Sequence, residues 1–386
     1  MVIKGRRSGA VRIGRLISRH RWWIIGIALL IAGVLFLIPD RANPFAKSSP
    51  GTEWTVVVVA GQSNAEGSNS FVSNMPNGEK LGDHPADDAS YIWWRAADGA
   101  GPSDATAFFQ ALTNPGYNPA GWISSESTDP NMEGLVKISD LDQPAPVGQK
   151  GLFGPEVGIV RELYDQGRRN IIVLKVSYGF QALALANSQF VPYDWYPDIP
   201  GQPQRNKSYT NLTQAYGELK NFIASRGDTH KVSGIFWLQG ETDTLDSGYT
   251  AAYETNLDLL VNRLKTDLEL APGGHVVLRK FNFRNCLDNA YPAVGNYCGF
   301  GYALGLENAS INSILNFITI NAIQSIPLNA SRVRTVRESI QDIADKYDWV
   351  DAVETDDRQF GNDFIHLSER GQLDVGRRMV QMYEVP

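Results

Sequence analysis

Three short polar segments of this chain each adjoin an apolar run, and their side chains are those of acyl transfer. Ser63 stands on a Gly-Gln-Ser-Asn turn directly after four valines and an alanine. Gln239 lies in a Trp-Leu-Gln-Gly-Glu-Thr-Asp segment, and Asp363 precedes His366 by three residues. A serine, a histidine base, an acid that orients the base and an amide that binds an oxyanion are the groups that acyl transfer needs. The sequence therefore indicates a serine hydrolase, although Gly, Ser and Asn are also ordinary turn residues.

The elements before these segments would bring them together. Residues 56–60 are apolar and mostly β-branched, which is typical of a strand buried on both faces of a parallel sheet. Residues 233–238 form a second apolar strand, and His366 precedes a helix-like run. Ligands of parallel sheets bind beyond the carboxyl ends of the strands. We therefore expect the three segments to meet at one edge of a sheet.

From Pro155 onward, strand-like and helix-like segments alternate, which indicates a parallel sheet covered by helices on both faces. We predict an α/β fold, a flavodoxin-like three-layer sandwich with a mainly parallel five-stranded sheet and long loop insertions. Residues 68–150 are expected to be such loops, with at least one of Trp93, Trp94 and Trp122 in a core. Beyond the first strand, the predicted strands are 171–177, 234–238, 275–281 and 349–353, and the predicted helices are 155–166, 209–224, 249–268, 331–347 and 368–383.

The three polar segments, in this order, resemble the conserved blocks of the SGNH-hydrolase superfamily. The Gln-Gly-Glu form of the middle segment is similar to the sialate O-acetylesterase and acetylxylan esterase branch, carbohydrate esterase family six. Residues 151–156 resemble the second block of that family, and residues 175–179 resemble its glycine block, where Phe180 replaces a second small residue. The resemblance spans residues 54–384, nearly the whole chain after its N-terminal segment.

The resemblance implies a role for each candidate residue. Ser63 would be the nucleophile, His366 its base and Asp363 the acid that orients the base. The oxyanion hole would consist of the backbone N–H groups of Ser63 and Gly179 and the side-chain amide of Gln239. Two alternatives stay open: Gln239 as a buried amide that ties two loops together, and Asp363 as a helix cap or a surface acid.

Three further residues are expected to support this site. Gln62 and Asn64 would brace the nucleophile turn. Glu241 would either serve His366 as a second acid or hold its own loop, and we favour the second role. The five histidines are scattered and form no zinc-binding pattern, so we expect neither a metal nor a cofactor.

The N-terminal segment has a different composition from the rest of the chain. Residues 22–38 form an unbroken apolar run, at the lower limit for crossing a bilayer, and only basic charges precede it. We predict a cytoplasmic basic tail at 1–21, a transmembrane signal-anchor at 22–38, a linker at 39–53 and an exported esterase domain at 54–386. A cleaved signal peptide is the alternative, and it too would export the domain.

The overall charge and the cysteines add two expectations. A net charge of −7 and the lack of a basic motif indicate that the chain does not bind nucleic acid. Cys286 and Cys298 are the only cysteines, and a disulfide between them is plausible in an exported protein, with two unrelated thiols as the alternative.

The predicted function is an extracytoplasmic serine esterase that removes O-acetyl groups from a carbohydrate through an acyl-enzyme. The family offers O-acetylated sialic acid, xylan-like chains or a cell-envelope glycan as the substrate, and Arg95 or Arg284 are candidates to bind a sialic acid carboxylate. A glycan O-acetyltransferase and a non-catalytic glycan-binding module are the alternatives. The oligomeric state is not predicted.

Overall fold

In the computed structural model, the described residues all lie after Pro50. The chain divides into Met1–Pro50 and Gly51–Pro386, and every described residue belongs to the second unit. The predicted signal-anchor lies outside the described residues, and among those residues no helix is long and apolar enough to cross a membrane. The described residues are 51–68, 70–96, 136–139, 153–177, 179, 181–184, 195–197, 207–281, 290–291, 297–298, 330–360 and 365–382.

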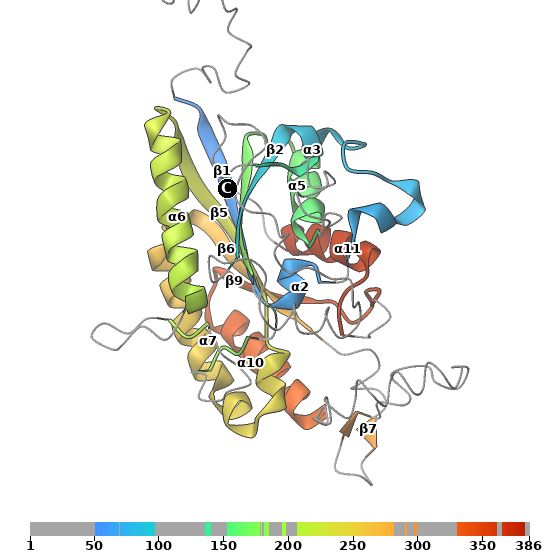
Figure 1. Cartoon of the computed structure of the whole chain (residues 1–386). Coiled ribbons are helices and arrows are strands. Elements are labelled where there is room, and N and C mark those ends of the chain that lie inside the picture. Colours follow the sequence, from blue (N-terminus) through green and yellow to red (C-terminus); the bar gives the residue numbers. More distant parts are fainter. Residues whose placement is uncertain are drawn as a thin grey trace, which may run out of the picture. The chain divides into compact units, whose positions relative to one another are not determined.

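A seven-stranded sheet with the order β3-β2-β4-β1-β5-β6-β9 forms the centre of this unit (Figure 1). Its strands are β1 Glu53–Gly61, β2 Ser90–Ala96, β3 Val136–Lys137, β4 Ile171–Ser177, β5 Thr229–Leu238, β6 Leu270–Lys280 and β9 Val350–Glu354. Six of the seven run parallel, and β3 is antiparallel to β2. The five predicted strands β1, β4, β5, β6 and β9 follow the flavodoxin-like order, with β1 between β4 and β5. The predicted α/β sandwich is therefore confirmed, with two more strands than expected. The short strands β7 Ala290–Tyr291 and β8 Tyr297–Cys298 pair separately.

The strand β2 corrects the expectation that residues 68–150 form only loops. It pairs in parallel with β4, for example Tyr91 with Ile172, and extends the sheet by one position. Its Tyr-Ile-Trp-Trp run has high strand propensity, but it is short and lies among turn-forming residues, so the sequence pattern concealed it. Trp93 is only 9% exposed and packs on Phe222 with ring centroids 5.7 Å apart, which confirms that one of the three tryptophans belongs to the core.

Helices cover both faces of the sheet in agreement with the prediction (Figure 1). α3, α5 and α11 lie on one face, and α6, α7 and α10 lie on the other. The helices are α2 Ser63–Glu66, α3 Pro85–Ala89, α5 Glu156–Asp165, α6 Lys207–Ser225, α7 Ser247–Asp267, α10 Ala330–Lys346 and α11 Glu369–Val380, with short 3₁₀ helices η1 Val72–Asn74, η2 Pro76–Gly78 and η5 Thr242–Leu245.

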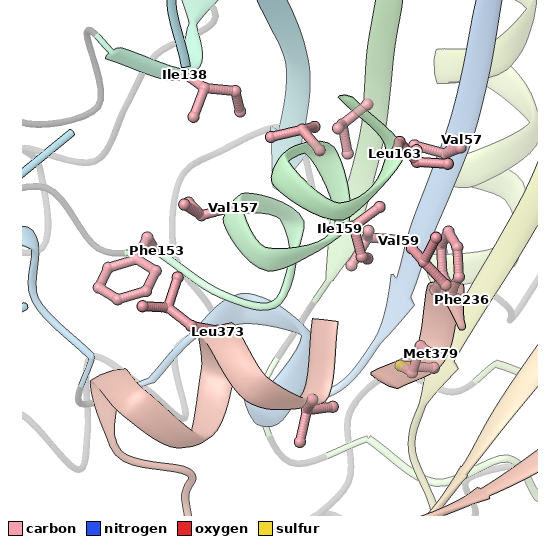
Figure 2. Packing of buried hydrophobic residues seen from close by; sticks show 14 of the residues in the cluster. Val57, Val59, Ile138, Phe153, Val157, Ile159, Leu163, Phe236, Leu373 and Met379 are labelled. Atoms are coloured by element: carbon pink, nitrogen blue, oxygen red, sulfur yellow. The ribbon is translucent and has the colours of Figure 1, made fainter. Parts of the chain in front are cut away.

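The core between β1, α5 and α11 fixes the position of the last helix. Val57 and Val59 of β1 belong to the same buried cluster as Ile159 of α5 and Met379 of α11 (Figure 2). α11 also approaches α5 at backbone distance, because a Cβ atom at Gly376 would lie 2.1 Å from the carbonyl oxygen of Pro155. A glycine is therefore required at this position, and the close contact holds the segment that precedes α11, which contains His366.

Candidate active site

The nucleophile turn is fixed to the end of the neighbouring strand. Gly61 ends β1 with φ at +142°, a conformation that favours glycine, and a Cβ atom there would lie 2.1 Å from the carbonyl oxygen of Leu238. The N–H of Gln62 donates to that same carbonyl at 2.9 Å. Ser63 then opens α2 with 8% of its surface exposed. The predicted nucleophile thus lies at the carboxyl ends of β1 and β5, the edge where the sequence placed it.

A buried ion pair holds the other end of α2. A helix of four residues is not stable by itself, so its position depends on external contacts. Lys175 of β4 donates to the carbonyl oxygen of Glu66 at 2.9 Å and forms an ion pair with Glu156 of α5, also at 2.9 Å. Glu156 accepts from the N–H of Gly154 at 2.8 Å. Burial lowers the pKa of Lys175, while the charge of Glu156 opposes that shift.

The side chain of Asn64 joins the nucleophile turn to the segment that carries His366. Its Nδ2 donates to the carbonyl oxygen of Ile365 at 3.3 Å, and its Oδ1 accepts from the N–H of Leu367 at 2.9 Å. These two residues flank His366, which is half-buried. The structure therefore brings the Ser63 and His366 segments together. Asp363 lies outside the described residues, and its role as the third member of a triad stays a prediction.

The loop after β5 contacts the same turn through Glu241. Glu241 Oε1 accepts from Asn64 Nδ2 at 2.8 Å and from Arg279 Nη1 at 3.0 Å. Gln62 Oε1 accepts from the N–H of Thr242 at 3.4 Å. These are the contacts that a brace would make, and they occupy the Glu241 oxygen nearest the turn. Sequence reasoning missed Arg279, although an arginine at the end of a predicted buried strand was a usable signal.

Gln239 is 1% exposed, and its amide is fully occupied by protein groups. Nε2 donates to the carbonyl oxygen of Gln181 at 2.9 Å and to Asp243 Oδ2 at 2.5 Å, while Oε1 accepts from Tyr253 at 3.3 Å. A primary amide has two N–H groups, and each has an acceptor here. This arrangement is that of an amide tying two loops together. A role in the oxyanion hole would require one of the two bonds to be released.

Asp243, to which the sequence reasoning assigned no role, organises the segment that follows Gly179. This carboxylate is fully buried and accepts from the N–H groups of Leu183 at 2.9 Å and Ala184 at 3.2 Å, in addition to Gln239. Burial raises the pKa of Asp243 to about 7, against the opposing effect of these hydrogen bonds. Gly179, the predicted oxyanion donor, is buried in the turn just before this segment.

The remaining site predictions fall largely outside the described side chains. Arg284 and Cys286 lie outside the described residues. For Arg95 in β2 and Cys298 in β8, only the backbone is described. Within the ranges that the structure describes, no cluster of three His, Cys, Asp or Glu side chains could hold a metal ion.

Comparison with known protein families finds a match in the middle of the chain. Residues 198–280 match the model of the family described as carbohydrate esterase, sialic acid-specific acetylesterase. The matched segment contains Gln239, Glu241, Asp243 and Arg279, whereas Ser63 and His366 lie outside it. No curated protein matches the chain.

Three solved structures are similar to the chain at 14% identity each. A protein from Arabidopsis thaliana aligns with 85% of this chain and 96% of its own, with a TM-score of 0.47. NanS aligns with 86% and 97%, with a TM-score of 0.48. A carbohydrate acetylesterase from Xanthomonas citri aligns with 84% of this chain and 54% of its own, with a TM-score of 0.45.

Proposed function

We propose that this chain is a carbohydrate O-acetylesterase, like the sialic acid-specific acetylesterase family whose model matches residues 198–280, and that it acts through an acetyl-enzyme formed on Ser63. One observation carries the mechanism. The side chain of Asn64 bonds to both neighbours of His366, so the residue next to the serine fixes the backbone of the histidine. Segments that carry a serine and a histidine and are held together at the carboxyl edge of a parallel sheet are suited to nucleophilic catalysis.

The reaction would proceed in two balanced steps. The Ser63 hydroxyl oxygen attacks the acetyl carbonyl while His366 takes the hydroxyl proton, and collapse of the tetrahedral intermediate passes that proton to the departing sugar oxygen. Water then attacks the acetyl-enzyme while His366 takes a proton from it, and collapse of the second tetrahedral intermediate passes that proton to Ser63 Oγ and releases acetic acid, which ionises to acetate. In this scheme Asp363 orients His366 and stabilises its protonated form.

The oxyanion would be stabilised by backbone N–H groups. Ser63 begins α2, and the first N–H groups of a helix have no acceptor within the helix. The N–H of Gly179 is the second donor in the proposal. Gln239 and Asp243 would keep the Gly179 loop in place, since they bond to Gln181, Leu183 and Ala184 just after it.

The substrate and the location are further parts of the proposal. The family description supports an O-acetylated sialic acid as the first substrate to test. The basic residues before the apolar run support an anchored domain outside the cytoplasm. Protease added to intact cells should then digest residues after 50, and protection of those residues would contradict this orientation.

The test is acetate release by the full chain from O-acetylated sialic acid, acetylated xylan and a simple acetyl ester. Ser63→Ala should lower kcat by about 10³-fold or more while leaving the fold intact. Ser73→Ala removes an exposed serine ten residues away and serves as the matched control. Equal activity of the two variants would exclude Ser63 as the nucleophile.

A further inference from the structure

We propose that Arg279 is a positioning residue for His366 and acts through Glu241 and Asn64; this inference rests on the proposed function. Arg279 lies at the carboxyl end of β6, two strands away from β1, and is 1% exposed. No role follows for it from the acyl-transfer mechanism itself. Its contacts lead to the site through a continuous set of buried polar groups.

The path from Arg279 to His366 has three steps. Arg279 Nε donates to Thr355 Oγ1 at 3.2 Å and its Nη1 donates to Glu241 Oε1 at 3.0 Å, so two contacts fix the plane of the guanidinium. Glu241 Oε1 also accepts from Asn64 Nδ2 at 2.8 Å. Asn64 then bonds to the backbone on both sides of His366. A change at Arg279 thus reaches His366 through a single shared oxygen.

The ion pair between Arg279 and Glu241 lacks the two parallel hydrogen bonds of a strong arginine–carboxylate pair. Arg161 offers the comparison, because its Nε and Nη2 meet the two oxygens of buried Asp87 at 3.0 and 2.8 Å. Arg279 instead meets one oxygen of Glu241, the one that Asn64 uses. Glu241 Oε2 and Arg279 Nη2 are buried and make no hydrogen bond within the described structure. Buried polar atoms without a partner lower the stability of the fold. We therefore infer that Arg279 serves to orient Glu241 toward Asn64 rather than to form the most stable ion pair.

Loss of Arg279 would leave Glu241 as a buried charge without a partner. The carboxylate would then turn away from Asn64 or take in water, and Asn64 would lose the contact that aligns it with Ile365 and Leu367. Misplacement of a catalytic group by about 1 Å can lower a rate about 10²-fold. Arg279 is proposed to act only through the position of His366, so the effect should fall on kcat and leave KM unchanged.

The experiment measures kcat and KM for acetate release by the full chain carrying Arg279→Met, with Arg161→Met as the matched control. We expect Arg279→Met to lower kcat about 10- to 100-fold with little change in KM. Arg161→Met also breaks a buried pair, but it should lose stability and keep kcat. Adding Glu241→Gln to Arg279→Met should restore most of kcat, because a neutral amide keeps an oxygen for Asn64 and needs no counter-charge.

Each outcome decides between the inference and its failure. If the parent shows Ser63-dependent acetate release but Arg279→Met matches Arg161→Met in kcat, or changes KM alone, only this inference is wrong. If the parent shows no such release, the proposed function fails and the inference fails with it. If Arg279→Met does not fold, Arg279→Gln replaces it: this side chain keeps a hydrogen-bond donor but removes the charge that pairs with Glu241, so a folded Arg279→Gln with the parental kcat overturns the inference.

Discussion

Replacing Asn64 by aspartate tests the junction between the serine and the histidine with almost no change in shape. Asn64 is completely buried. The introduced carboxylate keeps an oxygen for the N–H of Leu367, but it places a second oxygen where Nδ2 now donates to Glu241 at 2.8 Å and to the carbonyl of Ile365 at 3.3 Å. Two acceptors lose a donor and face another acceptor instead.

The expected loss follows from these two contacts. A hydrogen bond to a charged acceptor contributes about 1.5–3 kcal/mol and one to a neutral acceptor about 0.5–1.5 kcal/mol, so loss of the contacts to Glu241 and to Ile365 predicts a fall of about 2–4 kcal/mol in the free energy of unfolding at neutral pH. In the fraction that stays folded, kcat should fall roughly 10²-fold, because the backbone of His366 loses one of its two fixed points. The folded state should raise the pKa of the introduced carboxyl beside Glu241, so the loss of stability should shrink as the pH is lowered.

Urea unfolding and acetate release measure these two effects separately. Asn74→Asp is the control, since Asn74 is exposed and its oxygen accepts from Ser73, a contact that a carboxylate retains. If Asn64→Asp were as stable and as active as Asn74→Asp, the hydrogen bonds of Asn64 would not connect the two segments, and the mechanism would lose its main structural support.

Three more predictions concern buried polar groups around the site. Gln239→Ala should lower the free energy of unfolding by about 2–6 kcal/mol, because the carbonyl of Gln181 and the carboxylate of Asp243 each lose a donor worth about 1–3 kcal/mol. If the variant were stable and only kcat fell, by about 10²-fold, the amide would belong to the oxyanion hole instead. Lys175→Met should cost about 3–5 kcal/mol in urea unfolding, and adding Glu156→Gln should recover most of it, because the cost comes from an unpaired buried charge; no recovery would refute this account. Burial raises the pKa of Asp243 to about 7 in the folded state, from the ordinary 3.8, so its contribution to stability is full below pH 4 and is lost as the pH rises through 7. The free energy of unfolding, measured from pH 4 to 8, should depend less steeply on pH in Asp243→Asn than in the parent, and an equal slope would contradict the shift.

The central strands of the sheet were predictable because each has a strong local sequence pattern. The valine run of β1 and the apolar run of β4 are buried on both faces, and a pattern of that kind identifies a central strand directly. The strand β2 escaped because four aromatic and β-branched residues among turn formers do not determine a strand until a neighbour such as β4 pairs with them.

The polar contacts of the site were predictable in kind but not in detail. Asn64 was expected to brace the nucleophile turn, yet its partners Ile365 and Leu367 lie about 300 residues away and follow no spacing rule. The buried amide of Gln239 matches an alternative that the sequence left open, but its partners could not be named: Asp243 lies four residues away, whereas Gln181 lies 58 residues away on another loop.

The separation of 301 residues between Asn64 and Ile365 has a consequence for how the protein is made. The ribosome synthesises Ser63 early and His366 late, so the growing chain has no complete site until residues 365–380 emerge and α11 packs on α5. Contacts between such distant residues also form slowly. We therefore expect no esterase activity until synthesis of the chain is complete. Removal of α11 should leave an inactive chain that still contains Ser63.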